Sequence, residues 1–178
     1  MISIPGYNVT EKLNEGMNSI VYRGQRKSDT KPVILKLLNN THPTSIELAR
    51  FKREYRITGS LNSRGVIRVY GLEKFNNSLV MVLEDFGGES LDRIIVRDPL
   101  TFTDFLPLSI RLADILGQVH QLRIIHKDIN PSNIVWNPEA DQVKIIDFGI
   151  ATELSRENPE ARNPDTLEGS LCYMSPEQ

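Results

Sequence analysis

The first 85 residues contain short runs of β-branched and aromatic side chains, separated by clusters of turn-forming residues. Such runs with polar boundaries are typical of β-strands. The five predicted strands cover residues 7–13, 20–25, 32–38, 66–75 and 79–84. The N-terminal half is therefore predicted to be mainly a β-sheet.

One helix is predicted between the third and fourth of these strands. Thr44 and Glu47 have the spacing of a capping box, which indicates where the helix begins. Gly59 has the place of a C-terminal cap. The predicted apolar face of the helix consists of Ile46, Phe51, Tyr55 and Ile57.

After Gly87 and Gly88, which we interpret as a linker, the pattern becomes helical. A short helix is predicted over residues 89–97 and a long one over 103–122. The apolar stripe of the long helix consists of Phe105, Leu108, Leu112, Ile115, Leu116 and Val119. Two short strands, over 134–136 and 143–146, follow. This order predicts an α+β fold, with a cleft where the two parts meet.

The composition is that of an ordinary globular domain, with 39% hydrophobic and 25% charged residues. The 178 residues carry a formal net charge of -2, from 21 basic and 23 acidic residues. The balance gives no basic excess for a nucleic-acid backbone, so no nucleic-acid partner is expected. The single cysteine, Cys172, excludes a disulfide within the chain and fits a reducing compartment.

No targeting or membrane segment is predicted in the sequence. The first nine residues do not combine a basic flank with an apolar run, so they do not form a signal peptide. Apolar runs are only a few residues long, whereas a membrane helix needs roughly 20. We expect a cytoplasmic protein with no direct membrane segment in this chain.

Two polar motifs in the C-terminal half carry the strongest chemical signal. The segment His126-Lys127-Asp128-Ile129-Asn130-Pro131-Ser132-Asn133 precedes Asp147-Phe148-Gly149, which ends a predicted strand. Either motif alone has an ordinary alternative, since Asp-Phe-Gly occurs by chance and Asp-x-Asn-Pro forms turns. Their order and spacing together resemble the catalytic loop and metal-binding triplet of protein kinases.

This resemblance implies a role for each polar residue. Asp128 would accept the proton of the attacking hydroxyl, as the catalytic base. Asn133 and Asp147 would supply the amide and carboxylate oxygens that bind magnesium. ATP and Mg²⁺ are therefore the expected cofactors.

The N-terminal half supports the same resemblance. Residues 33–36, Val-Ile-Leu-Lys, resemble the third-strand motif whose lysine binds the α- and β-phosphates. Glu54 lies where the partner glutamate of that lysine is expected, so an ion pair with Lys36 is implied. The alternative is two unrelated surface charges, since most Lys and Glu side chains are exposed.

The segment 13–22 has the position of the glycine-rich phosphate loop. Only Gly16 of the three expected glycines is present, with Asn14 and Ser19 in the other two places. Both replacements are mild, because Asn tolerates positive φ and Ser is small. The resemblance implies that Leu13 and Val21 enclose the adenine.

The segment 82–88 resembles the hinge between the two lobes of a kinase. It implies that Leu83 is the gatekeeper and that the backbones of Glu84 and Phe86 bind the adenine edge. Val135 would form the floor of the pocket, and Ile34 replaces the usual alanine beside the adenine. The alternative for these apolar residues is core packing, and both interpretations can hold together.

The end of the chain, 167–177, resembles the end of an activation segment, with Ser-Pro-Glu for Ala-Pro-Glu. The sequence of this segment is typical of bacterial serine/threonine kinases. The sequence Asp-Ile-Asn-Pro-Ser-Asn resembles the corresponding motif in the N-terminal kinase domains of large bacterial hybrid multisensor signalling proteins. The implied fold is bilobal, with a five-stranded antiparallel N-lobe carrying one helix over 1–86 and a truncated helical C-lobe over 87–178.

Two positions depart from the family pattern. Asn130 replaces a lysine that helps to neutralise the γ-phosphate, so phosphoryl transfer should be slower unless another group compensates. Lys127 replaces an arginine and lacks its bidentate grip on a phosphorylated loop. Regulation by phosphorylation at Thr166 is therefore only weakly indicated, and Thr166 has the alternative of a solvated loop residue.

The expected function is that of a serine/threonine protein kinase domain in bacterial signalling, acting on a protein substrate. The alternatives are a pseudokinase that only binds nucleotide and a small-molecule phosphotransferase. The activation-segment motif argues against the latter. We also expect further C-terminal signalling domains, and helices after Gln178. An arginine in that later part is expected to pair with Glu177. These 178 residues alone are then expected to be marginally stable and weakly active or inactive.

Overall fold

The computed structural model describes residues 2–154 and 169–174. The chain divides into two compact units, described separately below. Unit 1 consists of Met1–Gly59 and Ile67–Gly87, and unit 2 of Ser60–Val66 and Gly88–Gln178. The short segment Ser60–Val66 thus belongs to the second unit, although it lies between two parts of the first in sequence.

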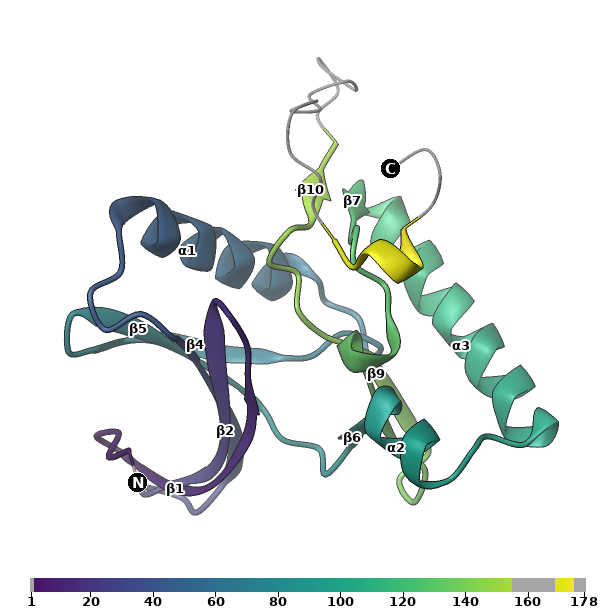
Figure 1. Ribbon diagram of the computed structural model, residues 1–178, viewed down its shortest axis with the longest axis horizontal. Coiled ribbons are helices and arrows are strands. Elements are labelled where there is room, and N and C mark those ends of the chain that lie inside the picture. The colour runs from purple at the N-terminus through teal and green to yellow at the C-terminus, as the bar shows by residue number, and fades with distance from the viewer. Residues whose placement is uncertain (1, 155–168, 175–178) are drawn as a thin grey trace. The chain divides into compact units, whose positions relative to one another are not determined.

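Unit 1 is built on one antiparallel sheet with the strand order β1-β2-β3-β5-β4 (Figure 1). The strands are β1 (Tyr7–Glu15), β2 (Ser19–Arg26), β3 (Pro32–Leu38), β4 (Val69–Phe75) and β5 (Ser78–Glu84). The predicted five-stranded sheet and the α+β class are confirmed. The fourth strand begins three residues later than predicted, because Val66 instead forms a parallel bridge with Ile145 in unit 2.

The two faces of this sheet carry different residues, because side chains alternate along each strand. One face packs into a hydrophobic core of Ile4, Tyr7, Val9, Val33, Leu35, Leu37, Val80 and Val82. The Tyr7 hydroxyl donates to Glu73 Oε1 at 2.6 Å and so joins β1 and β4, the two edge strands. A bond between opposite edges requires a strongly curved sheet, as the ribbon shows (Figure 1).

Helix α1 (Ser45–Ser60) begins with the predicted capping box. Glu47 N donates to Thr44 Oγ1 at 3.2 Å, while Thr44 N donates to Glu47 Oε2 at 2.7 Å. These bonds lower the pKa of Glu47, chiefly through the Thr44 backbone N–H. The Gly59 cap is wrong: the helix continues through Gly59 to Ser60, without the left-handed backbone that favours glycine. Phe51 and Ile57 of the predicted apolar face are buried, whereas Ile46 is 66% exposed.

Unit 2 combines two main helices with short strands. Its elements are β6 (Glu89–Ser90), α2 (Leu91–Arg97), α3 (Phe102–Gln121), β7 (Ile124–Ile125), the 3-10 turn η1 (Pro131–Asn133), β8 (Ile134–Asn137), β9 (Gln142–Ile145), β10 (Thr152–Glu153) and the 3-10 turn η2 (Leu171–Tyr173). They form one sheet of order β6-β8-β9 and a β10-β7 pair. Helix α2 begins two residues later than predicted, because Glu89 and Ser90 pair with Trp136 and Val135.

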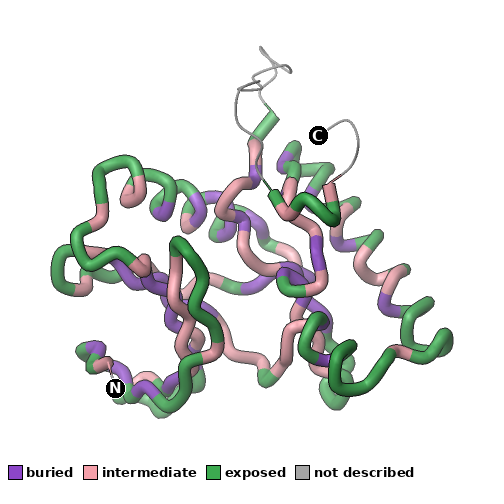
Figure 2. The backbone as a smooth tube through the Cα atoms, viewed as in Figure 1, coloured by how far each residue is buried: buried purple, intermediate pink, exposed green. Residues whose placement is uncertain are grey.

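Helix α3 buries Leu108, Ile115 and Val119 from its predicted stripe (Figure 2). Phe105 is wrong as a core residue, since 53% of it is exposed near the N-terminal end of the helix. Close packing at the helix centre requires Gly65, where an added Cβ would lie 2.1 Å from Ile115 Cγ1. Within residues 2–154 and 169–174, no helix has the length and apolarity needed to cross a membrane.

Candidate functional site

Lys36 and Glu54 form a buried ion pair in unit 1. Lys36 Nζ donates to Glu54 Oε1 at 2.7 Å, from strand β3 to helix α1. Each side chain is only 8% exposed. The structure therefore contains the pair that the motif implied, rather than two surface charges. Charges buried to this degree are costly unless they are paired, so each depends on the other.

The strand register places four predicted nucleotide-site residues on one face of the sheet, opposite the hydrophobic core. Val21 lies opposite Lys36, and Ile34 lies opposite Leu83. Directly opposed residues in neighbouring strands point to the same side. Leu13 falls at an irregularity of β1, between Lys12 and Asn14. Such bulges redirect side chains next to functional sites.

The connection between β1 and β2, residues 16–18, is held by its own backbone and by one asparagine. Gly16 N donates to Ser19 O at 2.9 Å. Asn39, just after β3, donates from Nδ2 to Gly16 O at 3.0 Å and from N to Asn18 O at 3.0 Å. Sequence reasoning missed Asn39, because no motif or period distinguishes it from any polar loop residue.

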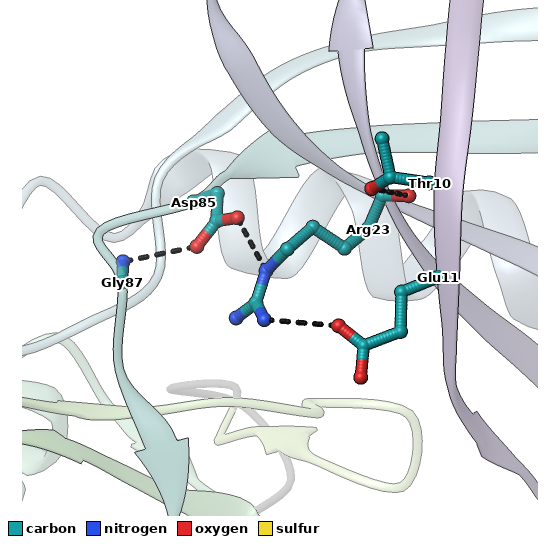
Figure 3. A network of polar contacts seen from close by, with 5 residues as sticks. All are labelled: Thr10, Glu11, Arg23, Asp85 and Gly87. Carbon is teal, nitrogen blue, oxygen red and sulfur yellow. Dashed lines mark hydrogen bonds and ion pairs between the residues drawn. The ribbon is translucent and has the colours of Figure 1, made fainter.

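The hinge segment 84–87 is fixed by four polar contacts within unit 1. Glu84 N donates to Arg68 O at 2.9 Å, and Arg68 N donates to Glu84 Oε1 at 2.7 Å. Asp85 accepts at Oδ2 from Arg23 Nε at 2.7 Å and at Oδ1 from Gly87 N at 2.9 Å (Figure 3). Sequence reasoning did not identify Arg23 or Asp85, since 62 residues separate them.

In unit 2 the carboxylate of Asp128 accepts one hydrogen bond on each oxygen. Asn133 Nδ2 donates to Oδ2 at 2.9 Å, and Ser170 N donates to Oδ1 at 2.9 Å. Asn133 Nδ2 also donates to the Asp128 carbonyl at 2.9 Å. The carboxylate is thereby oriented by its own loop and by the segment that ends the described chain. Each oxygen keeps a second lone pair for a further donor.

Asn130 is a buried capping residue, 5% exposed. Its Oδ1 accepts from Ser132 N at 3.0 Å and from Asn133 N at 3.2 Å, at the start of η1. Its Nδ2 donates to Ser170 Oγ at 3.1 Å. Asn130 thus holds the loop in shape, which is a different task from the charge neutralisation expected of a lysine at this position.

His126 connects the catalytic loop to the Asp-Phe-Gly triplet. Its Nε2–H donates to Ile146 O at 2.9 Å, while Nδ1 accepts from Asp128 N at 3.2 Å. One donor and one acceptor nitrogen describe a neutral imidazole. Burial lowers the pKa of His126, which is 1% exposed. Its ring meets Phe148 edge-on, with centroids 4.6 Å apart.

The antiparallel β8–β9 hairpin brings the two predicted metal ligands to the same end of unit 2. Asn133 precedes β8 and Asp147 follows β9, and Ile146 N donates to Asn133 O at 3.0 Å. Asp147 has a φ of 62°, a left-handed backbone that is rare for residues other than glycine. Its Oδ1 accepts from Gly149 N at 3.2 Å. Val135, the predicted pocket floor, lies in β8 and is half-buried.

An amide oxygen and a carboxylate fit Mg²⁺, which commonly takes one or two protein ligands and completes its shell with phosphates and water. Among the described residues, no three His, Cys, Asp or Glu side chains cluster to form a metal cage. The predictions for Thr166 and for the Ser-Pro-Glu motif at 175–177 lie outside the described residues.

The sequence has recognisable relatives among known proteins. The sequence matches the protein kinase domain family over residues 7–178. It is 30% identical to serine/threonine-protein kinase pkn2 of Myxococcus xanthus, over 97% of this chain and 21% of that protein. It is 32% identical to pkn3 of the same organism, over 97% of this chain and 33% of that protein. It is 28% identical to PknL of Mycobacterium tuberculosis, over 97% of this chain and 43% of that protein.

The chain thus spans less than half the length of these curated relatives. The family match nevertheless covers both units, including the ion pair of unit 1 and the catalytic loop of unit 2. This chain belongs to the protein kinase domain family.

Proposed function

We propose that the chain acts as a serine/threonine protein kinase domain, which transfers the γ-phosphoryl group of ATP to a protein hydroxyl in bacterial signal transduction. The observation that carries this proposal is the Asp128 carboxylate, held on both oxygens by Asn133 and Ser170. The bacterial relatives are named serine/threonine-protein kinases, which supports the choice of substrate hydroxyl.

Asp128 serves as the catalytic base in this proposal. Phosphoryl transfer demands an attacking hydroxyl aimed in line with the leaving oxygen. A carboxylate that is oriented by two N–H donors can accept a hydrogen bond from that hydroxyl in a fixed direction, and then take its proton. Ser170 contributes to this orientation through its backbone, so the residue has a positioning role.

Unit 1 supplies the nucleotide contacts of the proposal. Lys36, held by Glu54, binds the α- and β-phosphates, and Gly16 lies in the loop above them. Leu13, Val21 and Leu83 contact the adenine, and the backbones of Glu84 and Phe86 bind its edge, with Val135 of unit 2 as a further apolar contact. The common face of Val21, Lys36 and Leu83 supports these assignments.

Asn133 and Asp147 hold magnesium in this proposal. The ion supplies positive charge that offsets the charge of the phosphates during transfer. Asn133 donates two hydrogen bonds from Nδ2 to Asp128, so its amide oxygen is oriented by the catalytic loop itself. The same residue therefore sets the direction of the base and of a metal ligand.

The remaining parts of the proposal concern the whole protein. We infer an N-lobe over 1–86 and a C-lobe over 87–178, followed by further signalling domains. The low coverage of the relatives supports additional domains, because most of each relative lies outside the match. The substrate is a protein, no nucleic acid is bound, and the need for ATP suits a cytoplasmic domain.

The test replaces Asp128 by Asn in the full-length natural protein. We expect phosphate transfer to a serine- and threonine-containing protein to fall by about 10²- to 10⁴-fold, with Mg-ATP affinity retained. Asp141→Asn is the matched control, because this carboxylate is 73% exposed and pairs with the surface residue Arg111. Mg-ATP binding by the wild type without any transfer would indicate a pseudokinase and overturn the proposal.

A further inference from the structure

Arg23 lies on the face of the unit 1 sheet that carries the predicted nucleotide contacts. It follows Val21 by two residues in β2 and stands opposite Ile34 of β3. Ile34 in turn stands opposite Leu83 of β5. Opposed residues point to the same side of a sheet, so Arg23 continues the row formed by Ile34 and Leu83. Its guanidinium group contacts Asp85 on one side and Glu11 on the other (Figure 3).

The side chain of Asp85, which is largely buried, forms an ion pair with Arg23. The Arg23 Nε–Asp85 Oδ2 distance is 2.7 Å, with side-chain exposures of 33% for Arg23 and 7% for Asp85. A carboxylate with so little solvent depends on its partner far more than a surface carboxylate does. The second partner of Arg23, Glu11, is 55% exposed and 3.3 Å away, which is the geometry of a weak surface pair.

The same carboxylate shapes the backbone of the hinge. Asp85 Oδ1 accepts from Gly87 N at 2.9 Å, which closes a turn around Phe86. Gly87 has a φ of 73°, in the left-handed region that favours glycine. Asp85 therefore links the side chain of Arg23, in β2, to the backbone conformation around Phe86.

We propose that Arg23 and Asp85 are positioning residues that fix the hinge backbone against the β1–β2 hairpin, and so set the affinity for the nucleotide base. This inference rests on the proposed function, because it assumes that the base lies on the face of Val21 and Leu83. Neither residue needs to touch the base or the reacting phosphate.

The pair acts from two sides of the base in this arrangement. Arg23 belongs to β2, which carries Val21, and Asp85 lies between Glu84 and Phe86. Loss of the pair leaves a buried charge and loosens the relation between these two groups of contacts. Because Lys36 and Asp128 are held by other partners, the transfer step itself keeps its geometry.

The experiment measures the dissociation constant of a non-hydrolysable Mg-ATP analogue by calorimetry, with steady-state kinetics beside it, on the full-length natural protein. Arg23→Met removes the charge and keeps the apolar stem. Asp85→Asn weakens the ion pair but keeps an oxygen for Gly87 N. Each variant should raise the dissociation constant and the KM for ATP about five- to tenfold, with kcat at saturating ATP within about twofold.

The double variant should bind no more weakly than Arg23→Met, because both single changes break the same pair. Glu11→Gln is the matched control and should change affinity by less than about twofold. Arg23→Lys, which keeps the charge, replaces Arg23→Met if the latter does not fold; it should weaken binding less than tenfold but measurably, because it lacks the planar Nε donor.

Wild-type protein that binds the analogue, with affinities unchanged in the Arg23 and Asp85 variants, would overturn this inference and leave the proposed function intact. A fall in kcat at constant KM would also overturn it, since that result places the pair in the transfer step. Wild-type protein that binds no nucleotide would overturn both proposals.

Discussion

The side-chain amide of Asn130 donates to the hydroxyl of Ser170 at 3.1 Å. This bond joins the catalytic loop to a residue 40 positions later, whose backbone N–H also holds Asp128. A lysine in place of Asn130 would offer a charge to the phosphates, but it could not accept the two backbone N–H bonds at the start of η1. The departure from the family pattern therefore replaces a cation with a cap.

Replacing Asn130 by Ala should lower both stability and phosphate transfer. The lost cap should cost about 0.5–2 kcal/mol in the free energy of unfolding. Transfer should fall mainly in kcat, because Asp128 loses part of its orientation while the nucleotide contacts of unit 1 remain. Urea unfolding and steady-state kinetics on the same preparations measure the two effects.

Asn137→Ala provides a control with the same chemistry at another turn. Asn137 Oδ1 accepts from Ala140 N at 3.0 Å in the turn between β8 and β9, at the end of β8 away from the catalytic loop. It should lose a similar amount of stability without any change in kcat. If Asn130→Ala and Asn137→Ala had equal effects on kcat, the positioning role of Asn130 would be wrong.

Replacing Lys36 by Met should destabilise the fold as well as stop transfer. Glu54 would keep a charge in a site where its side chain is 8% exposed. Breaking a buried pair from one side typically costs about 3–5 kcal/mol. Thermal or urea unfolding should show this loss, and a transfer assay should show the loss of activity.

The double change Lys36→Met with Glu54→Leu separates the two effects. Removing both charges should restore much of the stability, since no buried charge remains unpaired. It should not restore transfer, because Lys36 binds the phosphates in the proposed function. Recovery of activity in the double variant would mean that Lys36 contributes only to stability.

His126 should make the stability depend on pH near neutrality. Its pKa is lowered in the folded state, because burial disfavours the charged ring. Below about pH 6.5 the unfolded chain therefore binds a proton that the folded chain does not, and stability falls as the pH falls. One histidine can contribute at most about 1.4 kcal/mol per pH unit to this slope. Urea unfolding between about pH 5.5 and 7 measures it.

His126→Gln should remove this contribution to the slope, although it also lowers the overall stability. His42→Gln, at an exposed histidine, is the control for the His-to-Gln substitution itself. An unaltered slope in His126→Gln would show that other groups control the pH dependence in this range.

The sequence predicted those parts of the site that local motifs define. Lys36, Glu54, Asp128, Asn133 and Asp147 belong to motifs of known spacing, and the structure places the first two in an ion pair and joins Asp128 to Asn133. The strands of unit 1 were predictable for a similar reason, because runs of β-branched and aromatic side chains with polar boundaries are typical of strands.

Contacts that depend on tertiary register could not be predicted in this way. Arg23 and Asp85 meet only because β2, β3 and β5 align, which no local period in the sequence records. The pairs formed by β6, β7 and β10 are two residues long and too short to show alternation. The exposure of Phe105 likewise depends on what surrounds α3, since its spacing alone fits the buried stripe.

Gly65 and Gly117 provide a matched test of packing in unit 2. An added Cβ at Gly65 would lie 2.1 Å from Ile115 Cγ1, whereas at Gly117 of α3 it would meet nothing within 4 Å. Gly65→Ala should cost about 1–3 kcal/mol through overpacking, and Gly117→Ala should gain up to about 1 kcal/mol of helix stability. Urea unfolding measures both. The cost at Gly65 should shrink when Ile115 is also replaced by Ala, because the added methyl then occupies the space that the isoleucine vacates. An equal cost in both backgrounds would contradict the close approach of Gly65 to α3.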